Sequence, residues 1–384
     1  MRSVFIALSP IHIGNGEQIS NWSYSLDKGK IKIYNFDRVV KALGDKQRYS
    51  LAQTIERYAS TKTLGEVMRD YGLNIECEYE LESKSSIKNS NGEYKAIFEF
   101  IKENGKVYIP GTEIKGAIRT ALFYKILKDR FQQDDKIKSD FLNRYKSCLN
   151  IQNADKKSIR RCFSRLEEIW ESIVFRDGFE NIQEDYRPAD IKKDFLRFLM
   201  VSDSSLQNPE DCLFVQDVKA LGVSRSFLEP YELLKAGAKF ELDLKIVINE
   251  QYKSLFPSTY RYLSLDNIIK ACKEFAIDIL KADIEYVEST KELDIQEKQK
   301  ILNRLRDRIN NIEKYNVIPL RIGKHQGFLS TTINLLVKSL DKNLYSRAYE
   351  YLVHRGYSDF PNKSRKLTAD YEFMGWCILN PLIK

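Results

Sequence analysis

Residues 110–119 read Pro110-Gly111-Thr112-Glu113-Ile114-Lys115-Gly116-Ala117-Ile118-Arg119 and join a strand to a helix. Proline and glycine end the strand, and Thr112 is expected to cap the helix that follows. Lys115 and Arg119 are four residues apart, so their side chains share one face of the first helical turns. Free N–H groups and the positive end of the helix dipole lie beside that face, and this combination favours a phosphate ligand.

The two residues after Lys115 are small, namely Gly116 and Ala117. Small side chains allow another backbone to approach the helix closely. That backbone is either the adjacent sheet, so that the residues serve packing, or a bound RNA strand. The residues alone leave both readings open.

The chain around this turn predicts strands that are interrupted by helices. Alternating apolar residues and turn residues predict strands at 4–8, 198–201 and 317–322, and hairpins at 22–34, 95–109 and 231–248, the last turning at 236–237. Helical patterns cover 112–174, 265–315 and about 328–340, and the part at 285–314 carries one apolar stripe. Because strands and helices do not alternate steadily, the pattern predicts an α+β architecture of two small sheets with insertions.

A second informative segment is Leu320-Arg321-Ile322-Gly323-Lys324-His325-Gln326-Gly327-Phe328-Leu329-Ser330. It predicts a strand, a loop with two glycines and a helix start, which together direct backbone N–H groups at a phosphate. Three residues separate the glycines and Phe328 follows them, so the segment lacks the spacing of a P-loop. Nucleotide hydrolysis is therefore disfavoured.

A third segment, Ser9-Pro10-Ile11-His12-Ile13-Gly14-Asn15-Gly16, passes from a strand edge into a loop that holds one of only three histidines. A histidine at a loop suggests a nuclease, since imidazole acts as a general base near neutral pH. Catalysis on RNA needs a second acid or base nearby, and the sequence does not show one. A structural or RNA-contacting His12 is the preferred interpretation.

Length and charge narrow the class of protein. A chain of 384 residues predicts two domains. Lys and Arg number 62 against 54 Asp and Glu, which gives a formal net charge of +8 and favours a polyanionic partner where the charge is clustered.

The cysteines and apolar runs exclude several other classes. The six cysteines form no close pair, so we expect neither a zinc site nor a redox motif, and we read them as small buried residues. The apolar run at 4–8 is too short for a secretory signal, and no later run is long enough to span a bilayer. A cytoplasmic protein without a cofactor or a membrane partner is expected.

Five motifs together resemble the RAMP proteins of type III CRISPR systems, and their order is most similar to the fifth-subunit family of the Csm complex. The motifs are SPIHIGNG at 9–16, YIPGTEIKGAIRTAL at 108–122, FLMVSDSS at 198–205, LRIGKHQGFLS at 320–330 and MGW at 374–376. One departure is that the family's loop often has a third glycine and a later basic residue, where this chain has His325 and Thr331.

The resemblance implies tandem ferredoxin-like domains with large helical insertions and no catalytic activity. It places an N-terminal domain at 1–225 with an insertion at about 125–190, and a C-terminal domain at 226–384 with an insertion at about 265–315 and the glycine-rich loop 323–327. The implied partners are the 3′ part of the guide RNA and other Csm subunits, especially the backbone RAMP subunit, with target RNA and recruited nucleases left open. The candidate RNA-binding residues are His12, Gly14, Gly111, Lys115, Gly116, Arg119, Arg321, Gly323, Lys324, His325 and Gly327.

Two alternatives stay open at this point. One is a metal-independent RNA endonuclease in which His12 or His325 activates a ribose 2′-hydroxyl. The other is a structural cap that contacts only proteins, against which the basic excess argues mildly. The leading hypothesis is a subunit that binds the guide backbone through phosphate contacts and shape, because guides differ in sequence.

Overall fold

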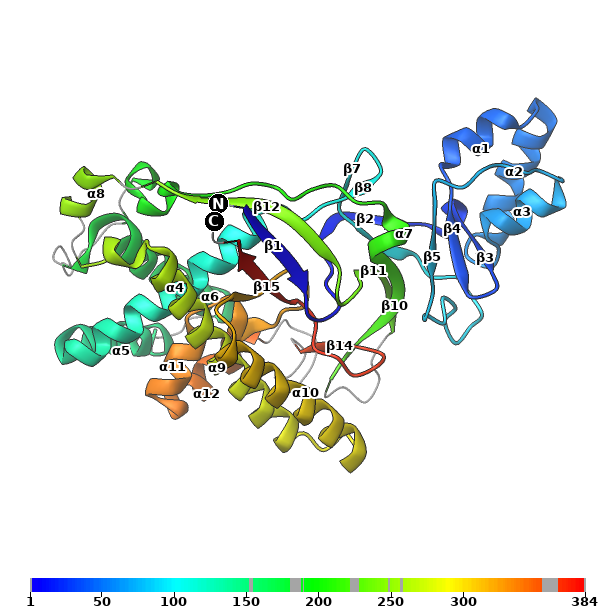
Figure 1. Ribbon diagram of the computed structural model, residues 1–384. Coiled ribbons are helices and arrows are strands. Elements are labelled where there is room, and N and C mark those ends of the chain that lie inside the picture. The colour runs from blue at the N-terminus through cyan, green and yellow to red at the C-terminus, as the bar shows by residue number, and fades with distance from the viewer. Residues whose placement is uncertain are drawn as a thin grey trace.

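The computed structural model describes residues 2–151, 155–179, 188, 190–221, 228–247, 249–255, 258–353 and 365–382. In this part of the chain two five-stranded sheets lie side by side, with most helices gathered against one of them (Figure 1). The first, sheet A, has the order β13 (Ile318–Arg321), β15 (Trp376–Pro381), β1 (Arg2–Ala7), β12 (Lys239–Ile246) and β9 (Leu199–Val201). The strands predicted at 4–8, 198–201 and 317–322 are therefore confirmed.

Sheet A and two helices form a ferredoxin-like unit. Along the chain the elements run β1, α4 (Gly111–Gln133), β9, β12, α9 (Leu265–Ser289) and β15, and the strands lie in the order β15-β1-β12-β9. All neighbouring strands are antiparallel, and β13 extends the sheet beyond β15. This is the βαββαβ arrangement of the ferredoxin-like fold. The helices pack on each other, and the Tyr124 hydroxyl donates a 2.7 Å hydrogen bond to Asp278. The α+β prediction is confirmed.

The second large sheet, sheet B, contains strands that lie far apart in the sequence. Its order is β14 (Lys366–Thr368), β10 (Leu213–Ala220), β11 (Glu229–Leu234), β6 (Ile97–Phe100) and β2 (Gly14–Ile19). The pair β6–β11 is parallel, and the other neighbours are antiparallel.

The predicted hairpin at 231–248 is wrong. The two strands exist and Gly237 turns the chain with φ +90°, but β11 pairs in sheet B whereas β12 pairs with β1 and β9 in sheet A. The turn thus connects two sheets, because each strand pairs with strands elsewhere in the chain: β11 with β10 and β6, and β12 with β1 and β9. Of the hairpin predicted at 95–109, only β7 (Lys102–Glu103) and β8 (Lys106–Val107) pair with each other, while β6 joins sheet B.

Both sheets combine strands from either side of residue 225. Sheet A takes β1 and β9 from the N-terminal part and β12, β13 and β15 from the C-terminal part, and sheet B is mixed in the same way. The division into domains at 1–225 and 226–384 stays a prediction, and it does not coincide with a division between the sheets. Helix α9 lies within the insertion predicted at about 265–315. In the structure it is the second helix of the ferredoxin-like unit.

An N-terminal lobe lies to one side of sheet B (Figure 1). It contains the sheet β3 (Tyr24–Asp27), β4 (Lys30–Ile33) and β5 (Tyr79–Glu82), and the predicted hairpin at 22–34 is its first pair. The helices α1 (Phe36–Ala42), α2 (Asp45–Tyr58) and α3 (Leu64–Asp70) pack around two small apolar clusters in this lobe. The sequence reading did not predict these three helices.

The remaining helices follow the predicted pattern with some corrections. The basic helical segment consists of α4, α5 (Asp135–Leu149) and α6 (Lys156–Ser172), and the later one ends in α10 (Ile295–Lys314). Thr112 is not the N-cap, because α4 begins at Gly111 after Pro110. Helix α10 buries most of the apolar stripe, whereas Ile309 is half-buried and Ile295 is 86% exposed. The helix predicted at 328–340 is broken into a short turn at Phe328–Ser330 and α11 (Asn334–Leu340), and α12 (Lys342–Val353) follows.

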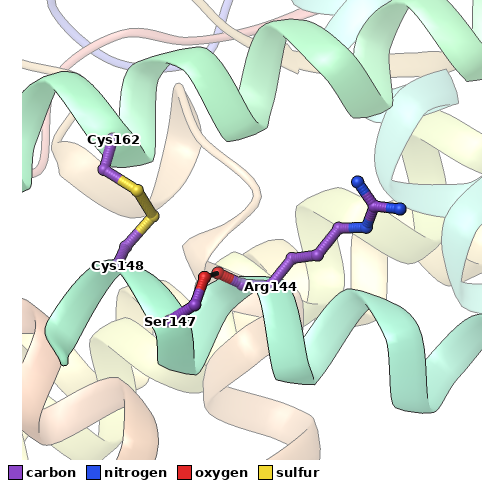
Figure 2. The surroundings of a disulfide bond; sticks show 4 residues. All are labelled: Arg144, Ser147, Cys148 and Cys162. Atoms are coloured by element: carbon purple, nitrogen blue, oxygen red, sulfur yellow. Dashed lines mark hydrogen bonds between the residues drawn. A yellow bond between two sulfur atoms is a disulfide. The ribbon is translucent and has the colours of Figure 1, made fainter. Parts of the chain in front are cut away.

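Two cysteines correct the sequence reading. Cys148 on α5 and Cys162 on α6 form a disulfide with their Cα atoms 5.5 Å apart (Figure 2). The sequence separation of 14 residues gave no sign of this contact, because it depends on how two helices pack. Cys212, Cys272 and Cys377 are buried, as predicted, and Cys77 is half-buried. Within the described ranges, no helix is long and apolar enough to cross a membrane.

Candidate nucleic-acid interface

Three of the motifs meet at one place in the structure. The Gly323 N–H donates to the Glu113 carboxylate at 3.2 Å, which joins the glycine-rich loop to the first turn of α4. The Lys324 N–H donates to the His12 carbonyl at 2.7 Å, which joins the same loop to the N-terminal motif. Segments more than 200 residues apart are thus held together by hydrogen bonds that the loop backbone donates, one to a side-chain carboxylate and one to a backbone carbonyl.

The start of α4 is partly occupied by the protein itself. The Gly111 N–H donates to the Asp203 carboxylate at 2.7 Å, and Asp203 belongs to the FLMVSDSS motif after β9. A Cβ at Gly111 would lie 2.5 Å from the Val201 carbonyl oxygen and 2.7 Å from that of Ser202. Gly111 therefore serves close packing, and a carboxylate already uses the first N–H of the predicted phosphate site.

The basic residues of α4 differ in their surroundings. Arg119 pairs with Glu171 and, at 2.7 Å, with Asp194, and its guanidinium lies 4.2 Å from the centroid of the Phe175 ring. Lys115 is half-buried, and among the described residues it forms no ion pair. Burial is the main influence on the pKa of Lys115 and lowers it. The Asp194 charge partly opposes this shift, and the Arg119 charge adds to it. Arg119 is thus held by the protein, and Lys115 is the cation that is left for an external anion.

The surroundings of Gly116 distinguish between the two interpretations of the small residues 116 and 117, namely packing against the sheet and close approach of an RNA strand. A Cβ at Gly116 would meet no atom within 4 Å, and the residue is exposed. Packing against the sheet therefore does not require glycine at this position. The open side of the helix next to Lys115 is accessible to another molecule.

The glycine-rich loop follows a path that needs special backbone angles. Gly323 has φ +78°, Gly327 has φ +89°, and His325 has φ +71° although it carries a side chain. A Cβ at Gly323 would lie 2.4 Å from the His12 carbonyl oxygen. The loop is thus fitted closely to the N-terminal motif.

Replacing Gly323 with alanine should therefore destabilise the protein by about 1–3 kcal/mol, the range for a strained backbone position. The matched control is Gly116→Ala, which lies in a helix with open space around it and should stabilise the protein by up to about 1 kcal/mol. Urea unfolding of both variants measures the difference. Equal stabilities of the two variants would contradict the close fit of the loop.

Arg321 is not available to RNA in this structure. It is 6% exposed, its Nη1 donates to Asp283 at 2.9 Å, and its Nε donates to the Met374 carbonyl at 3.0 Å. The family resemblance implied it as a contact, but its side chain points into the core and holds β13 to α9. Arg321 therefore positions the loop from inside.

His12 is also buried, at 1% exposure. Its Nδ1–H donates to the Glu232 carbonyl at 2.9 Å, and a Cβ at Gly14 would lie 2.8 Å from its Nε2. Burial lowers the pKa of His12 to about 4; the hydrogen bond to Glu232 raises it, and the charges of Lys324 and Lys102 lower it. Gly14 thus makes room for a neutral imidazole that belongs to the core.

Two aromatic rings that the sequence reading missed lie at the centre of this junction. Phe98 on β6 and Tyr231 on β11 are register partners and stack with centroids 4.4 Å apart. The rings of His12 and His325 stand edge-on to Tyr231 at 4.9 and 5.1 Å. The exposed Lys324 places its Nζ 4.0 Å from the Phe98 centroid. Tyr231 is 1% exposed, so of the two rings only the half-buried Phe98 reaches the surface. A cation beside an accessible ring is typical of surfaces that bind single-stranded nucleic acid.

Two polar atoms near Tyr231 have no hydrogen-bond partner among the residues that the structure describes. They are Nε2 of His325 and Nε2 of Gln216, the latter directly opposite Tyr231 across β10–β11. Burial lowers the pKa of His325 to about 3, and the charges of Lys366, Lys324 and His12 lower it as well. His325 is therefore neutral at physiological pH. No group of residues that could hold a metal ion occurs in the described ranges.

Comparison with known families identifies the class. The model of the RAMP superfamily matches residues 4–325, which is most of the chain. The protein thus belongs to the RAMP superfamily.

Individual relatives agree with the more specific resemblance seen in the motifs. The chain is 24% identical to the CRISPR system protein Csm5 of Methanocaldococcus jannaschii over 364 residues, which are 90% of this chain and 76% of the relative. It is 33% identical to Csm5 of Streptococcus thermophilus over 130 residues, which are 30% of this chain and 36% of that protein. The predicted resemblance to the fifth Csm subunit is confirmed.

Solved structures support the same fold. One chain of a Csm–crRNA–target RNA ternary complex from a type III-A CRISPR–Cas system matches with a TM-score of 0.72 and 22% identity, covering 99% of this chain and 100% of that one. The crystal structure of T. onnurineus Csm5 matches with a TM-score of 0.66 and 21% identity, covering 98% of this chain and 99% of that one.

Proposed function

We propose that this protein is a non-catalytic RNA-binding subunit of a type III-A Csm effector complex, acting in antiviral defence in the cytoplasm. In this proposal it binds and caps the 3′ part of the guide RNA and supports guide maturation and assembly. Its partners are the guide RNA, the target RNA and other Csm subunits, among them the backbone RAMP subunit, and nucleases recruited for maturation. The relatives named Csm5 and the likeness to a chain of a Csm–crRNA–target RNA complex support this assignment.

The observation that carries the proposal is the junction of the motifs. Lys115 forms no ion pair within the described part of the chain, the helix surface at Gly116 is open, and Lys324 stands exposed over Phe98. A phosphate contact needs a cation that the protein does not already neutralise, and a stacking contact needs a nearby ring. The cations are supplied by segments that hydrogen bonds from the backbone of the glycine-rich loop hold together, and the ring lies beside Lys324 of that loop.

The burial of His12 supports the non-catalytic part of the proposal. A general base must come within hydrogen-bond reach of the ribose 2′-hydroxyl. His12 is 1% exposed and its Nδ1–H is used by Glu232, so its ring faces the core. Incubating the purified protein with a repeat RNA tests this point. Cleavage that disappears in His12→Asn or in His325→Asn would replace the proposal with the endonuclease reading.

The RNA contact is tested with the double variant Lys115→Gln/Lys324→Gln. Counterion release gives a log Kd–log salt slope of about 0.7 per phosphate neutralised on a single strand, so the slope should fall by about 1.4. Fluorescence anisotropy with labelled oligouridine at several salt concentrations measures it in the full chain.

The control for this experiment is Lys270→Gln/Lys281→Gln. These two lysines are exposed on α9. Replacing them removes the same amount of charge at another place, so the salt slope should equal that of the wild type. Equal slopes for both double variants would reject the junction as an RNA contact. A chain that binds no RNA but still assembles with Csm subunits would favour the structural cap.

A further inference from the structure

Helix α6 has two faces of opposite character. Its apolar residues recur at helical spacing, and Ile159, Phe163, Leu166 and Trp170 are buried. Lys157, Arg161 and Arg165 follow each other at intervals of four residues. At 100° per residue, this row lies on the side of the helix opposite to the buried residues. The helix therefore turns a line of cations outward.

Within the part of the chain that the structure describes, no carboxylate pairs with the cations of this row. Lys157, Arg161 and Arg165 are exposed, and none of them forms an ion pair within the described ranges. Arg160 lies next to the row and uses its Nε to bond the Tyr351 carbonyl at 2.7 Å, which leaves its Nη groups over the same surface. Counting only residues that the structure describes, the acids nearby are Asp155, which caps the helix, and Glu168. Four cations thus face two carboxylates.

The surface is hollowed as well as charged. Lys157, Arg160, Arg161 and Arg165, together with Ser164 and Glu168, line a groove of about 630 Å³. At a rise of 1.5 Å per residue the row from Lys157 to Arg165 is about 12 Å long. One strand of a duplex carries a phosphate about every 3.4 Å along its axis, so the row spans several phosphates.

The disulfide fixes the orientation of this face. Cys162 lies next to Arg161 in sequence and is bonded to Cys148 of α5 (Figure 2). Because the bond joins α6 to α5, the rotation of α6 about its own axis is restrained. The row of cations is therefore presented in one direction.

We propose that the α6 basic face, defined as Lys157, Arg160, Arg161 and Arg165, is a second phosphate-binding surface that contacts the RNA backbone. It lies on a different helix from the motif junction and uses none of its residues. Arginine supplies three of the four cations, and its planar guanidinium matches a phosphate with two hydrogen bonds. The inference rests on the proposed function only for the identity of the polyanion as RNA.

The test compares three variants of the full chain with labelled oligouridine as the probe. The α6 variant is Lys157→Gln/Arg161→Gln/Arg165→Gln, and it retains Arg160 because that side chain also holds α12. The control is Lys270→Gln/Lys281→Gln/Lys300→Gln, which removes three exposed cations from α9 and α10. The third variant is Lys115→Gln/Lys324→Gln. Thermal unfolding verifies that each variant is folded.

The inference predicts that the salt slope falls by about 2 in the α6 variant and does not change in the control, since three phosphate contacts at about 0.7 each are lost. A reduced slope in the Lys115/Lys324 variant with an unchanged slope in the α6 variant overturns the second surface and leaves the proposed function standing. The reverse result supports the second surface and rejects the junction. An α6 variant that binds RNA normally but no longer assembles with Csm subunits also overturns the inference, because the face then binds an acidic protein.

Discussion

Replacing Asp283 with alanine is expected to destabilise the protein by about 3–5 kcal/mol, the cost of leaving a buried charge without its partner. Asp283 on α9 is 3% exposed, and its two carboxylate oxygens accept hydrogen bonds of 2.9 Å from Arg321 and from Arg365. In the described ranges Asp283 is the one acidic partner of Arg321, which is itself buried. Without Asp283, two guanidinium groups face each other in the core.

The same change should disturb the RNA-binding junction. Arg321 is the last residue of β13, directly before the glycine-rich loop, and Asp283 holds it against α9. Urea unfolding measures the stability. The matched control is Glu288→Ala, which removes a half-exposed pair with Arg306 and should cost less than about 1 kcal/mol. A loss for Asp283→Ala no larger than that of the control would contradict the account of this core.

The second large effect is a loss of stability in acid that depends on His12. The folded protein holds His12 with a pKa lowered from 6.5 to about 4, so below pH 6.5 the unfolded chain binds a proton that the folded chain does not. Stability therefore falls as the pH decreases from 6.5 towards 4. At about 1.36 kcal/mol per pH unit, the contribution of His12 reaches about 3 kcal/mol at pH 4 and about 2 kcal/mol at pH 5.

The comparison of wild type with His12→Asn isolates this term. Asparagine retains an N–H donor for the Glu232 carbonyl but does not titrate. Between pH 7 and pH 5 the variant should lose about 2 kcal/mol less than the wild type in urea unfolding. Glu167 acts in the opposite direction, since burial raises its pKa to about 7, but it is present in both proteins. Identical pH dependence of the two proteins would show that His12 is not buried as a neutral group.

The strands and the class of fold were predictable because they depend on local pattern. Alternation at 4–8 identified β1, and the turn at Pro110-Gly111 identified the strand-to-helix transition, although α4 begins at Gly111 and not after Thr112. The pairing of the strands was not predictable in the same way. Residues 231–248 carry an acceptable hairpin pattern, yet their two strands belong to different sheets, because long-range partners compete with the local one.

The candidate site was predictable in part. Lys115, Gly116 and Lys324 lie at the surface as the motifs indicated, whereas Arg321 and His12 in the same motifs are buried. A motif shows which residues occur together but not which side of the backbone each one faces. Phe98 and Tyr231 were missed because their stacking depends on a parallel pairing between β6 and β11, which are 133 residues apart by their register partners. The alternating FEF of β6 was the only signal for them.

The central claim is that this protein works on RNA within a Csm complex. Purifying the tagged protein from its own cells, sequencing the RNA that accompanies it and identifying the accompanying proteins tests this claim most directly. The account predicts guide RNAs derived from CRISPR repeats and spacers, together with other Csm subunits, and a smaller RNA yield from the Lys115→Gln/Lys324→Gln variant. Recovery of the protein without guide RNA and without Csm subunits would contradict it.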